Sequence, residues 1–468
     1  MKKIIIILFS IFFIAGCTNG TQDINHFEKG QDYLKELEYD EALNEFQLAS
    51  SQSPSEENSY LAIAEIYTKK GNNDKALEIL KNAYVNIESE NISNAIGQIY
   101  INIGDLNESI KWYETTLQKN SNNHDAIKGK IKLLSLNNDV DGVKTYMDGL
   151  DNEKFDSEIL IMKSIVNLDD TKEASRLMLL SNTVDDRNVD LSVELRLAII
   201  AYENAKTVHN LSEIIYILLN YGWYEIAQLP VSKVHLDNPF YETGYIYQAL
   251  INIKTLQLDK AIENLSKAEE INPDNIDVEI LRIQILTLKQ EIEIAENALN
   301  ELIIKDNLEL TNGQYSTIQQ MLYQQGKFEQ IEMLHTKNKD KLEFTPETQL
   351  LYVDSLLRLN KFNQAEQIIF EINSKDVVLA TPLQAKLKTF EAVVNYELDK
   401  KQQGIDMITE AENIDNAIPI IHYYKGVLLN DMGRPSEAKL AFDRAVELDL
   451  IGDITDLVNN ITEGNNDE

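Results

Sequence analysis

The fold is decided by a short stretch near the start of the chain, Gly30 to Pro54, which reads GQDYLKELEYDEALNEFQLASSQSP. A small residue, Ala42, stands inside it, and a large one, Phe46, follows four positions later. Two antiparallel helices cross closely only where one side chain is nearly absent, and a large neighbour fills the hollow beside the crossing. The stretch therefore predicts a pair of packed helices, closed by Pro54, which does not continue a helix.

The same pattern recurs along the chain with a spacing of about 34 residues. With Ile331 as the one large exception, small residues stand at Ala42, Ala76, Ser109, Gly142, Ala174, Ala227, Ala261, Ala295, Ile331, Ala365, Gly404 and Ala438. The steps between them are 34, 33, 33, 32, 53, 34, 34, 36, 34, 39 and 34 residues. A constant period of this length is typical of stacked repeats, in which each helix pair buries its apolar face against its neighbours.

The repeats resemble tetratricopeptide repeats. The first carries Gly30, Tyr33, Ala42, Phe46, Ala49 and Pro54, and the last carries Gly426, Gly433, Ala438, Phe442 and Ala445 at the same offsets. The resemblance implies an all-α solenoid of about twelve helix pairs forming a right-handed superhelix. We expect its helix-packing positions at Ala42, Ala76, Ala227, Ala261, Ala295, Ala365 and Ala438. Sharp turns between paired helices are expected at Gly71, Gly104, Gly222, Gly326 and Gly433, and at Asn137 and Asn360.

Three departures from the period divide the chain. The 53-residue step leaves room for an extra helix, which we expect near Asn188 to Asn204. We interpret residues 186–207 as a boundary and hinge between an N-terminal array, 23–185, and a C-terminal array, 208–452; a rigid spliced helix is the alternative. Pro230 falls inside a second helix and is expected to bend or break it. The 39-residue step before Gly404 predicts a longer loop near Ser374 to Pro382, and 453–468 are expected to form a short helix and a disordered acidic tail.

The N-terminus reads MKKIIIILFSIFFIAGC. A basic start and a twelve-residue apolar run, too short to span a bilayer, are typical of a secretory signal. The end of the run, Ile14 to Cys17, resembles the lipobox of bacterial lipoproteins. That resemblance implies a signal peptide at 1–16, a diacylglyceryl group on Cys17 and a lipid-anchored linker at 17–22. An ordinary cleaved signal with an incidental cysteine is the alternative.

The net charge of −34, from 43 basic and 77 acidic residues, excludes nucleic acid as a partner class, because no basic cluster is present to neutralise phosphates. We expect instead basic or apolar protein partners, with the bilayer contacted through the acyl anchor on Cys17. The location we expect is extracytoplasmic, at the outer face of a bacterial cytoplasmic membrane.

Residues that carry chemistry are sparse. The six histidines are dispersed, and no phosphate loop, nucleophile elbow or metal motif is found. His26 and His422 share one repeat position and are expected to pack. A weak calcium-loop pattern from Asn137 to Asp148 is explained better by a helix turn. We expect no enzyme activity, no metal and no cofactor.

The resemblance places the partner-binding residues on the inner face, at the second, fifth, ninth and twelfth positions of each repeat. In the seventh and eighth repeats these positions are apolar. They and the next repeat predict a candidate partner groove at Tyr216, Leu219, Ile246, Leu250, Ile253 and Ile280. The alternative is that neighbouring repeats cover these side chains. The leading hypothesis for function is a membrane-anchored scaffold for protein–protein interaction or envelope complex assembly; a subunit of a cell-envelope enzyme complex and a peptide-binding receptor are the alternatives.

Overall fold

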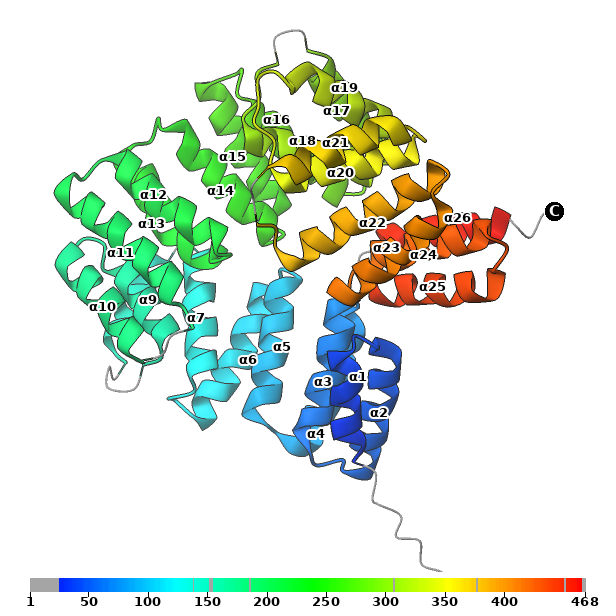
Figure 1. The fold of residues 1–468 in the computed structure, drawn as a ribbon. Helices are drawn as coiled ribbons and strands as arrows, with labels where there is room; N and C mark the ends of the chain where they lie inside the picture. The colour runs from blue at the N-terminus through cyan, green and yellow to red at the C-terminus, as the bar shows by residue number, and fades with distance from the viewer. Residues whose placement is uncertain are drawn as a thin grey trace, which may run out of the picture.

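The structure, a computed structural model, is all-α in the part of the chain that it describes: residues 25–137, 139–150, 155–184, 187–305, 308–375, 378–449 and 452–464. These residues form 26 helices, which stack as twelve antiparallel pairs with α11 between the fifth and sixth pairs and α26 at the end (Figure 1). The first six pairs are α1 (His26–Lys35) with α2 (Tyr39–Gln52), α3 (Glu57–Lys69) with α4 (Asn73–Ile87), α5 (Glu90–Asn102) with α6 (Leu106–Lys119), α7 (His124–Leu136) with α8 (Val140–Asp148), α9 (Ser157–Val166) with α10 (Thr171–Val184), and α12 (Val208–Asn220) with α13 (Tyr224–Asp237). The other six are α14 (Glu242–Lys254) with α15 (Leu258–Ile271), α16 (Ile276–Leu288) with α17 (Ile292–Ile304), α18 (Asn312–Gln324) with α19 (Phe328–Asn338), α20 (Pro346–Arg358) with α21 (Phe362–Ser374), α22 (Thr381–Glu397) with α23 (Lys401–Ile414), and α24 (Pro419–Asp431) with α25 (Pro435–Leu448). The predicted α-solenoid of twelve helix pairs is confirmed.

The small residues lie where the paired helices touch. The seven expected alanines all lie on the second helix of a pair and are at most 1% exposed: Ala42, Ala76, Ala227, Ala261, Ala295, Ala365 and Ala438. At Ser109 the approach is close enough for its Oγ to donate a hydrogen bond of 2.7 Å to the Gly97 carbonyl of the facing helix. A Cβ built on Gly426 would lie 2.5 Å from the ring of Phe442, so the large residue of the repeat fills the space that the glycine leaves. The close approach of the two helix backbones therefore requires a small residue at this position of the repeat.

Turns inside the pairs use the left-handed backbone region. Gly71, Gly104, Gly222, Gly326 and Gly433 have φ between +67° and +80°, and Asn360 has φ +57°. Asn137 was also expected there, but its φ is −79°, because it is the C-cap residue of α7 and lies before the turn. Positive φ is also found in the turns at Leu37, Leu256, Gln290 and Asp399. Side chains of these types do not favour this backbone region, so the sequence alone does not predict it there.

Side-chain hydrogen bonds also tie successive repeats together. Glu90 accepts hydrogen bonds of 2.9 Å from Asn120 and from Asn123, which are 30 and 33 residues further along the chain. Glu242 is bonded in the same way by Asn272 and Asn275, again 30 and 33 residues on. Each carboxylate at the start of a first helix therefore anchors the loop that leads into the next pair.

The irregular steps have distinct structural causes. The extra helix is present as α11 (Val189–Asn204), and one hydrophobic cluster runs continuously from Ile127 to Ile251 across it. The expected division into two arrays with a hinge stays a prediction. Pro230 does not break its helix, because α13 is continuous from Tyr224 to Asp237. The 39-residue step before Gly404 has two causes. One is the connection after Ser374, and the other is α22, which has 17 residues and is four residues longer than α20.

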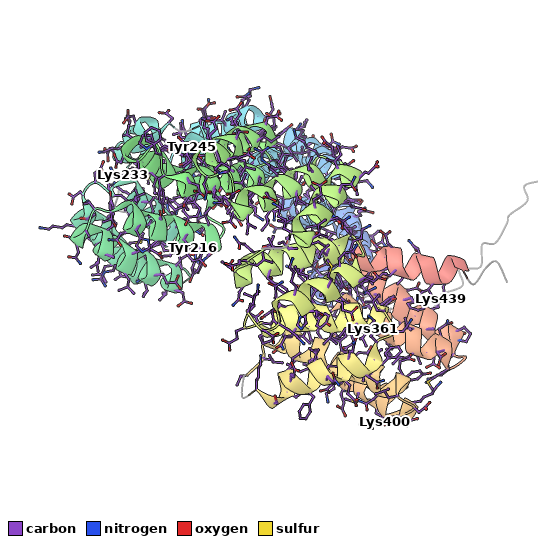
Figure 2. The ribbon with its side chains drawn as sticks, turned by 90° about the horizontal axis from the view of Figure 1, so that it is seen from above. Tyr216, Lys233, Tyr245, Lys361, Lys400 and Lys439 are labelled. Carbon is purple, nitrogen blue, oxygen red and sulfur yellow. The ribbon has the colours of Figure 1, made fainter. Side chains whose placement is uncertain are left out.

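The solenoid curls until its two ends meet. In Figure 1 the last pair, α24 and α25, lies beside α1 and α2. Arg444 of α25 donates a hydrogen bond of 2.6 Å to the carbonyl of Glu36, more than 400 residues away. Seen from above, Lys361, Lys400 and Lys439 lie in a different lobe from Tyr216, Lys233 and Tyr245 (Figure 2). The final helix, α26 (Asp453–Gly464), packs on α24 and α25 as a thirteenth first helix would. No helix among the described residues is long and apolar enough to cross a bilayer.

Candidate binding groove on the inner helices

A groove of about 630 Å³ lies between the first helices of the last repeats. It is formed by α18, α20, α22 and α24, with α26 at one side. The residues that face it recur at helical spacing, which places each set on one stripe of its helix. On α18 these are Ser316, Gln320 and Gln324; on α20, Glu347, Leu351, Asp354 and Arg358; on α22, Leu383, Lys386 and Phe390. Ile454 and Leu457 of α26 complete the lining.

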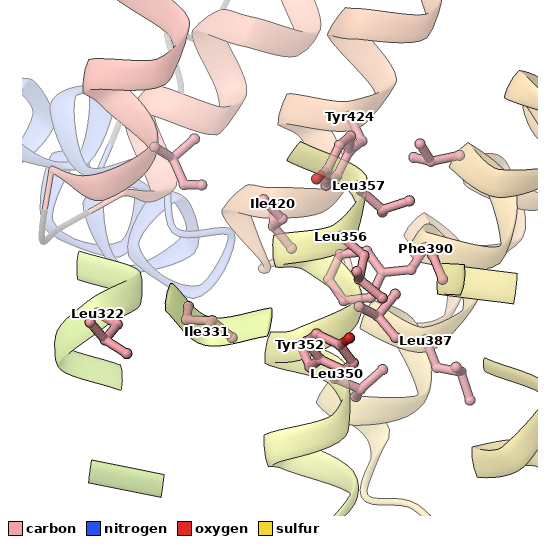
Figure 3. Close-up of a cluster of buried hydrophobic side chains, with 14 of the residues drawn as sticks. Leu322, Ile331, Leu350, Tyr352, Leu356, Leu357, Leu387, Phe390, Ile420 and Tyr424 are labelled. Atoms are coloured by element: carbon pink, nitrogen blue, oxygen red, sulfur yellow. The ribbon is translucent and has the colours of Figure 1, made fainter. Parts of the chain in front are cut away.

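The hydrophobic core beneath the groove holds these helices in place. Figure 3 shows Leu350, Leu356 and Phe390 packed between α20 and α22, with Ile420 and Tyr424 of α24 beside them. Leu356 is fully buried and Phe390 is 3% exposed. Close-packed side chains of this kind do not rearrange freely, so the groove is largely preformed.

A buried polar cluster joins three inner helices at the floor of the groove. Asp354 of α20 is 2% exposed and accepts hydrogen bonds from the hydroxyls of Tyr323 on α18 and Tyr424 on α24. Arg358, one turn further along α20, donates from Nε to Asp354 at 3.2 Å and from Nη2 to the Tyr323 hydroxyl at 3.0 Å. A buried charge is tolerated when it is paired and hydrogen-bonded, and Asp354 meets both conditions.

Neighbouring charges keep Arg358 charged, and burial keeps Tyr424 protonated. The Arg358 guanidinium lies 5.4 to 5.6 Å from the ring centres of Tyr323, Phe328 and Tyr423. Burial acts to lower the pKa of Arg358, but the carboxylate of Asp354 and the nearby tyrosines outweigh it and raise the pKa. Burial, followed by the charge of Asp354, raises the pKa of Tyr424 well above 10. Tyr424 therefore stays protonated and donates its hydrogen bond throughout the physiological range.

One buried acceptor in the groove wall has no hydrogen-bond partner among the residues that the structure describes. Gln319 is fully buried; its Nε2 donates to the carbonyl of Thr348 at 3.0 Å, while its Oε1 is without a hydrogen bond. An unpaired buried acceptor costs free energy, and because this oxygen has almost no exposed surface, a ligand lying in the groove does not reach it.

The residues predicted as a partner groove lie elsewhere and are mostly covered. Leu219, Ile246, Ile253 and Ile280 are 4–9% exposed and belong to three different hydrophobic clusters. Leu250 is half-buried, and Tyr216 alone is well exposed, at 53%. The expectation of an exposed apolar strip is therefore wrong for the four buried residues, because adjacent first helices pack on the face that the sequence left open.

The other residues singled out by the sequence have local roles. His26 bonds to Glu45 at 2.5 Å, and His422 bonds to the Asn416 carbonyl at 2.8 Å and pairs with Glu412 at 3.3 Å. Asp139, from the weak calcium pattern, accepts a hydrogen bond from the Gly142 backbone and so caps α8. Within the described ranges, no group of three or more His, Cys, Asp or Glu residues is arranged to hold a metal. Cys17 lies outside the residues that the structure describes.

Comparison with known proteins identifies the repeat type in one part of the chain. Two tetratricopeptide repeat family models match residues 59–90 and 91–118, which correspond to α3 to α6. No curated protein matches this sequence.

Three solved structures are similar to this chain over much of their length. The Cut9–Hcn1 heterotetramer of APC/C is 12% identical, over 92% of this chain and 94% of that one, with a TM-score of 0.41. Yeast Tom70 is 13% identical, over 94% of both chains, with a TM-score of 0.25. A tetratricopeptide repeat protein from Parabacteroides merdae is 14% identical, over 56% of this chain and 97% of that one, with a TM-score of 0.31. All three scores are below 0.5, so the fold described above stands on this chain's own helices.

Proposed function

We propose that this tetratricopeptide repeat solenoid is a membrane-anchored, extracytoplasmic scaffold that binds a segment of a partner protein in the groove of α18, α20, α22 and α24. The observation that carries the proposal is the preformed groove, in which apolar side chains such as Leu351, Leu383 and Leu457 lie among polar ones such as Ser316, Gln320 and Lys386. Pockets of this kind, mostly apolar with a few converging polar groups, are typical of binding sites. The proposed role is assembly of an envelope complex, without catalysis by this chain.

The geometry favours an apolar partner segment. Leu351, Leu383 and Leu457 are half-buried and line the groove, which gives a ligand apolar surface to cover. Asp354 and Arg358 neutralise each other, so they add no net charge to the floor. An apolar segment without net charge fits both features.

Photo-crosslinking in intact cells tests the groove. A photoreactive residue is placed at Leu383, inside the groove on α22, or at Phe370, which is 73% exposed on the outer helix α21. We expect a single partner adduct from position 383, mapped by mass spectrometry to one apolar segment, and none from position 370. Equal adducts from both positions, or an adduct from position 370 alone, would show that the partner does not bind in the groove.

The anchor is tested separately by fractionation. The support for it is the signal-like N-terminus and its single cysteine, Cys17. We expect the wild-type chain in the membrane fraction after an alkaline wash and Cys17→Ser in the soluble fraction, because stable attachment needs two acyl chains, which a diacylglyceryl group supplies. Retention of Cys17→Ser in the washed membranes contradicts the anchor without bearing on the groove.

A further inference from the structure

The two ends of the solenoid are joined through one side chain. Arg444 of α25 donates from Nη2 to the Glu36 carbonyl at 2.6 Å and from Nη1 to the Leu37 carbonyl at 3.5 Å. Both acceptors lie in the turn between α1 and α2, at the opposite end of the sequence. In Figure 1, α25 lies across the upper end of this first pair.

The chemistry of the contact is specific to a cation at a helix C-terminus. The last carbonyls of a helix have no partner within it, and the helix dipole makes that end negative. Glu36 is the C-cap residue of α1, and Leu37 follows it with φ +59°. The planar guanidinium holds its donors in a fixed fork and here places one on each carbonyl, whereas an ammonium group is a compact charge on a flexible stem. Arg444 therefore caps α1 from the far end of the chain.

A neighbouring carboxylate holds the guanidinium in position. Glu447, one turn along α25, pairs with Nη1 of Arg444 at 2.7 Å. The side chains of Arg444 and Glu447 are each 21% exposed, so the pair is shielded from solvent more than the Arg434–Glu437 pair at the start of the same helix, where the exposures are 41% and 54%. The two arginines differ in role: Arg434, the N-cap residue of α25, pairs locally with Glu437, while Arg444 also reaches the first repeat.

A second approach occurs inside the ring. The turn between α5 and α6 faces the turn between α14 and α15: a Cβ built on Gly104 would lie 3.7 Å from the Thr255 carbonyl oxygen and 3.8 Å from Leu256. These turns are about 150 residues apart in sequence, so the solenoid doubles back on itself before its ends meet.

We propose that Arg444 is an intramolecular latch that closes the solenoid into a ring by capping α1, and that removing its guanidinium opens the ring. The latch is also connected to the groove along the chain. The chain continues from α25 into α26, whose Ile454 and Leu457 line the groove wall. End-to-end closure therefore restrains that wall. The proposal does not depend on the groove having a ligand.

The test is the distance between the two ends in solution. Spin labels are attached to cysteines at Gln47 on α2 and Lys439 on α25, both exposed, in a full-length chain whose only native cysteine is replaced by Cys17→Ser. Pulsed electron resonance is expected to give one narrow distance for this parent. With Arg444→Ala the distribution should broaden and move to longer distances.

Matched variants separate latch loss from general damage. Arg434→Ala removes the arginine at the N-cap of α25 and should leave the parent distribution unchanged. Arg444→Lys keeps the charge but not the fixed fork of donors, so it should give an intermediate distribution, and helicity by circular dichroism should be equal in all variants. A broad, long distribution in the parent, or identical distributions for Arg444→Ala and Arg434→Ala, overturns the proposal.

Discussion

The buried cluster under the groove gives a sharp prediction for Arg358→Met. The substitution keeps the side-chain volume and removes the charge, leaving Asp354, 2% exposed, without its cation. Breaking a buried ion pair by removing one partner costs about 3–5 kcal/mol. Asp354 keeps two tyrosine hydroxyls as donors, so we expect the lower end, about 3 kcal/mol.

The assay must report on the C-terminal half of the chain. Both tryptophans, Trp112 and Trp223, lie in the N-terminal half, so their fluorescence serves as an internal control. Hydrogen exchange read by mass spectrometry should show faster exchange in α18, α20 and α24 of Arg358→Met, with urea unfolding followed by tryptophan fluorescence unchanged. Stability in repeat proteins is roughly a sum of local terms, which is why a local loss is expected.

Two further variants test whether the loss comes from the unpaired charge of Asp354. Arg434→Met removes a more exposed pair and should cost between 0 and about 1 kcal/mol. Adding Asp354→Leu to Arg358→Met removes the unpaired carboxylate. The double variant should therefore lose less free energy of unfolding than the sum of the losses measured for Arg358→Met and Asp354→Leu separately. If Arg358→Met costs no more than Arg434→Met, the cluster does not stabilise this half of the molecule and the reasoning is refuted.

Three other predictions concern packing and pH. Gly426→Ala should destabilise by about 1–2 kcal/mol in urea unfolding, since its Cβ would lie 2.5 Å from Phe442. Gly313→Ala, with nothing within 4 Å, should be neutral or stabilise by up to about 1 kcal/mol; equal losses would contradict the close-crossing account. Ser109→Ala should cost about 1 kcal/mol through the lost hydrogen bond to the facing helix, and no change would show that the bond is not formed. Burial lowers the pKa of His335 from 6.5 to about 4, so the unfolded chain binds a proton that the folded chain refuses between these values. The free energy of unfolding should therefore fall by about 1–3 kcal/mol as the pH falls from 6.5 to 4, and this slope should shrink in His335→Phe; an unchanged slope would contradict it.

The helix pairs were predictable because their cause is local. A close helix crossing requires a small residue at a fixed position of the repeat. Ala42, Ala261 and Ala438 therefore predict their crossings without knowledge of the rest of the chain. The break that was one of the two outcomes expected at Pro230 does not occur, for the opposite reason: a proline breaks a helix in isolation, but packing of α13 within the cluster from Ile127 to Ile251 holds the helix continuous.

The groove was missed because the sequence was searched for apolar inner positions alone. The same positional rule, applied to the repeats that start at residues 312 and 346, selects Ser316, Gln320 and Tyr323, and then Glu347 and Asp354. These polar residues look like solvated helix faces until the curvature of the array brings them together. Ring closure had no sequence signal, since Arg444 meets Glu36 only through the summed rotation of every repeat between them.

The most direct test of the central claim, that the inner helices of the last repeats bind a partner, is hydrogen exchange of the full chain with and without the crosslinked partner segment. We predict slower exchange on binding in α18, α20 and α22, and no change in the outer helices α19, α21 and α23. Slower exchange confined to the outer helices, with the inner ones unchanged, would contradict it.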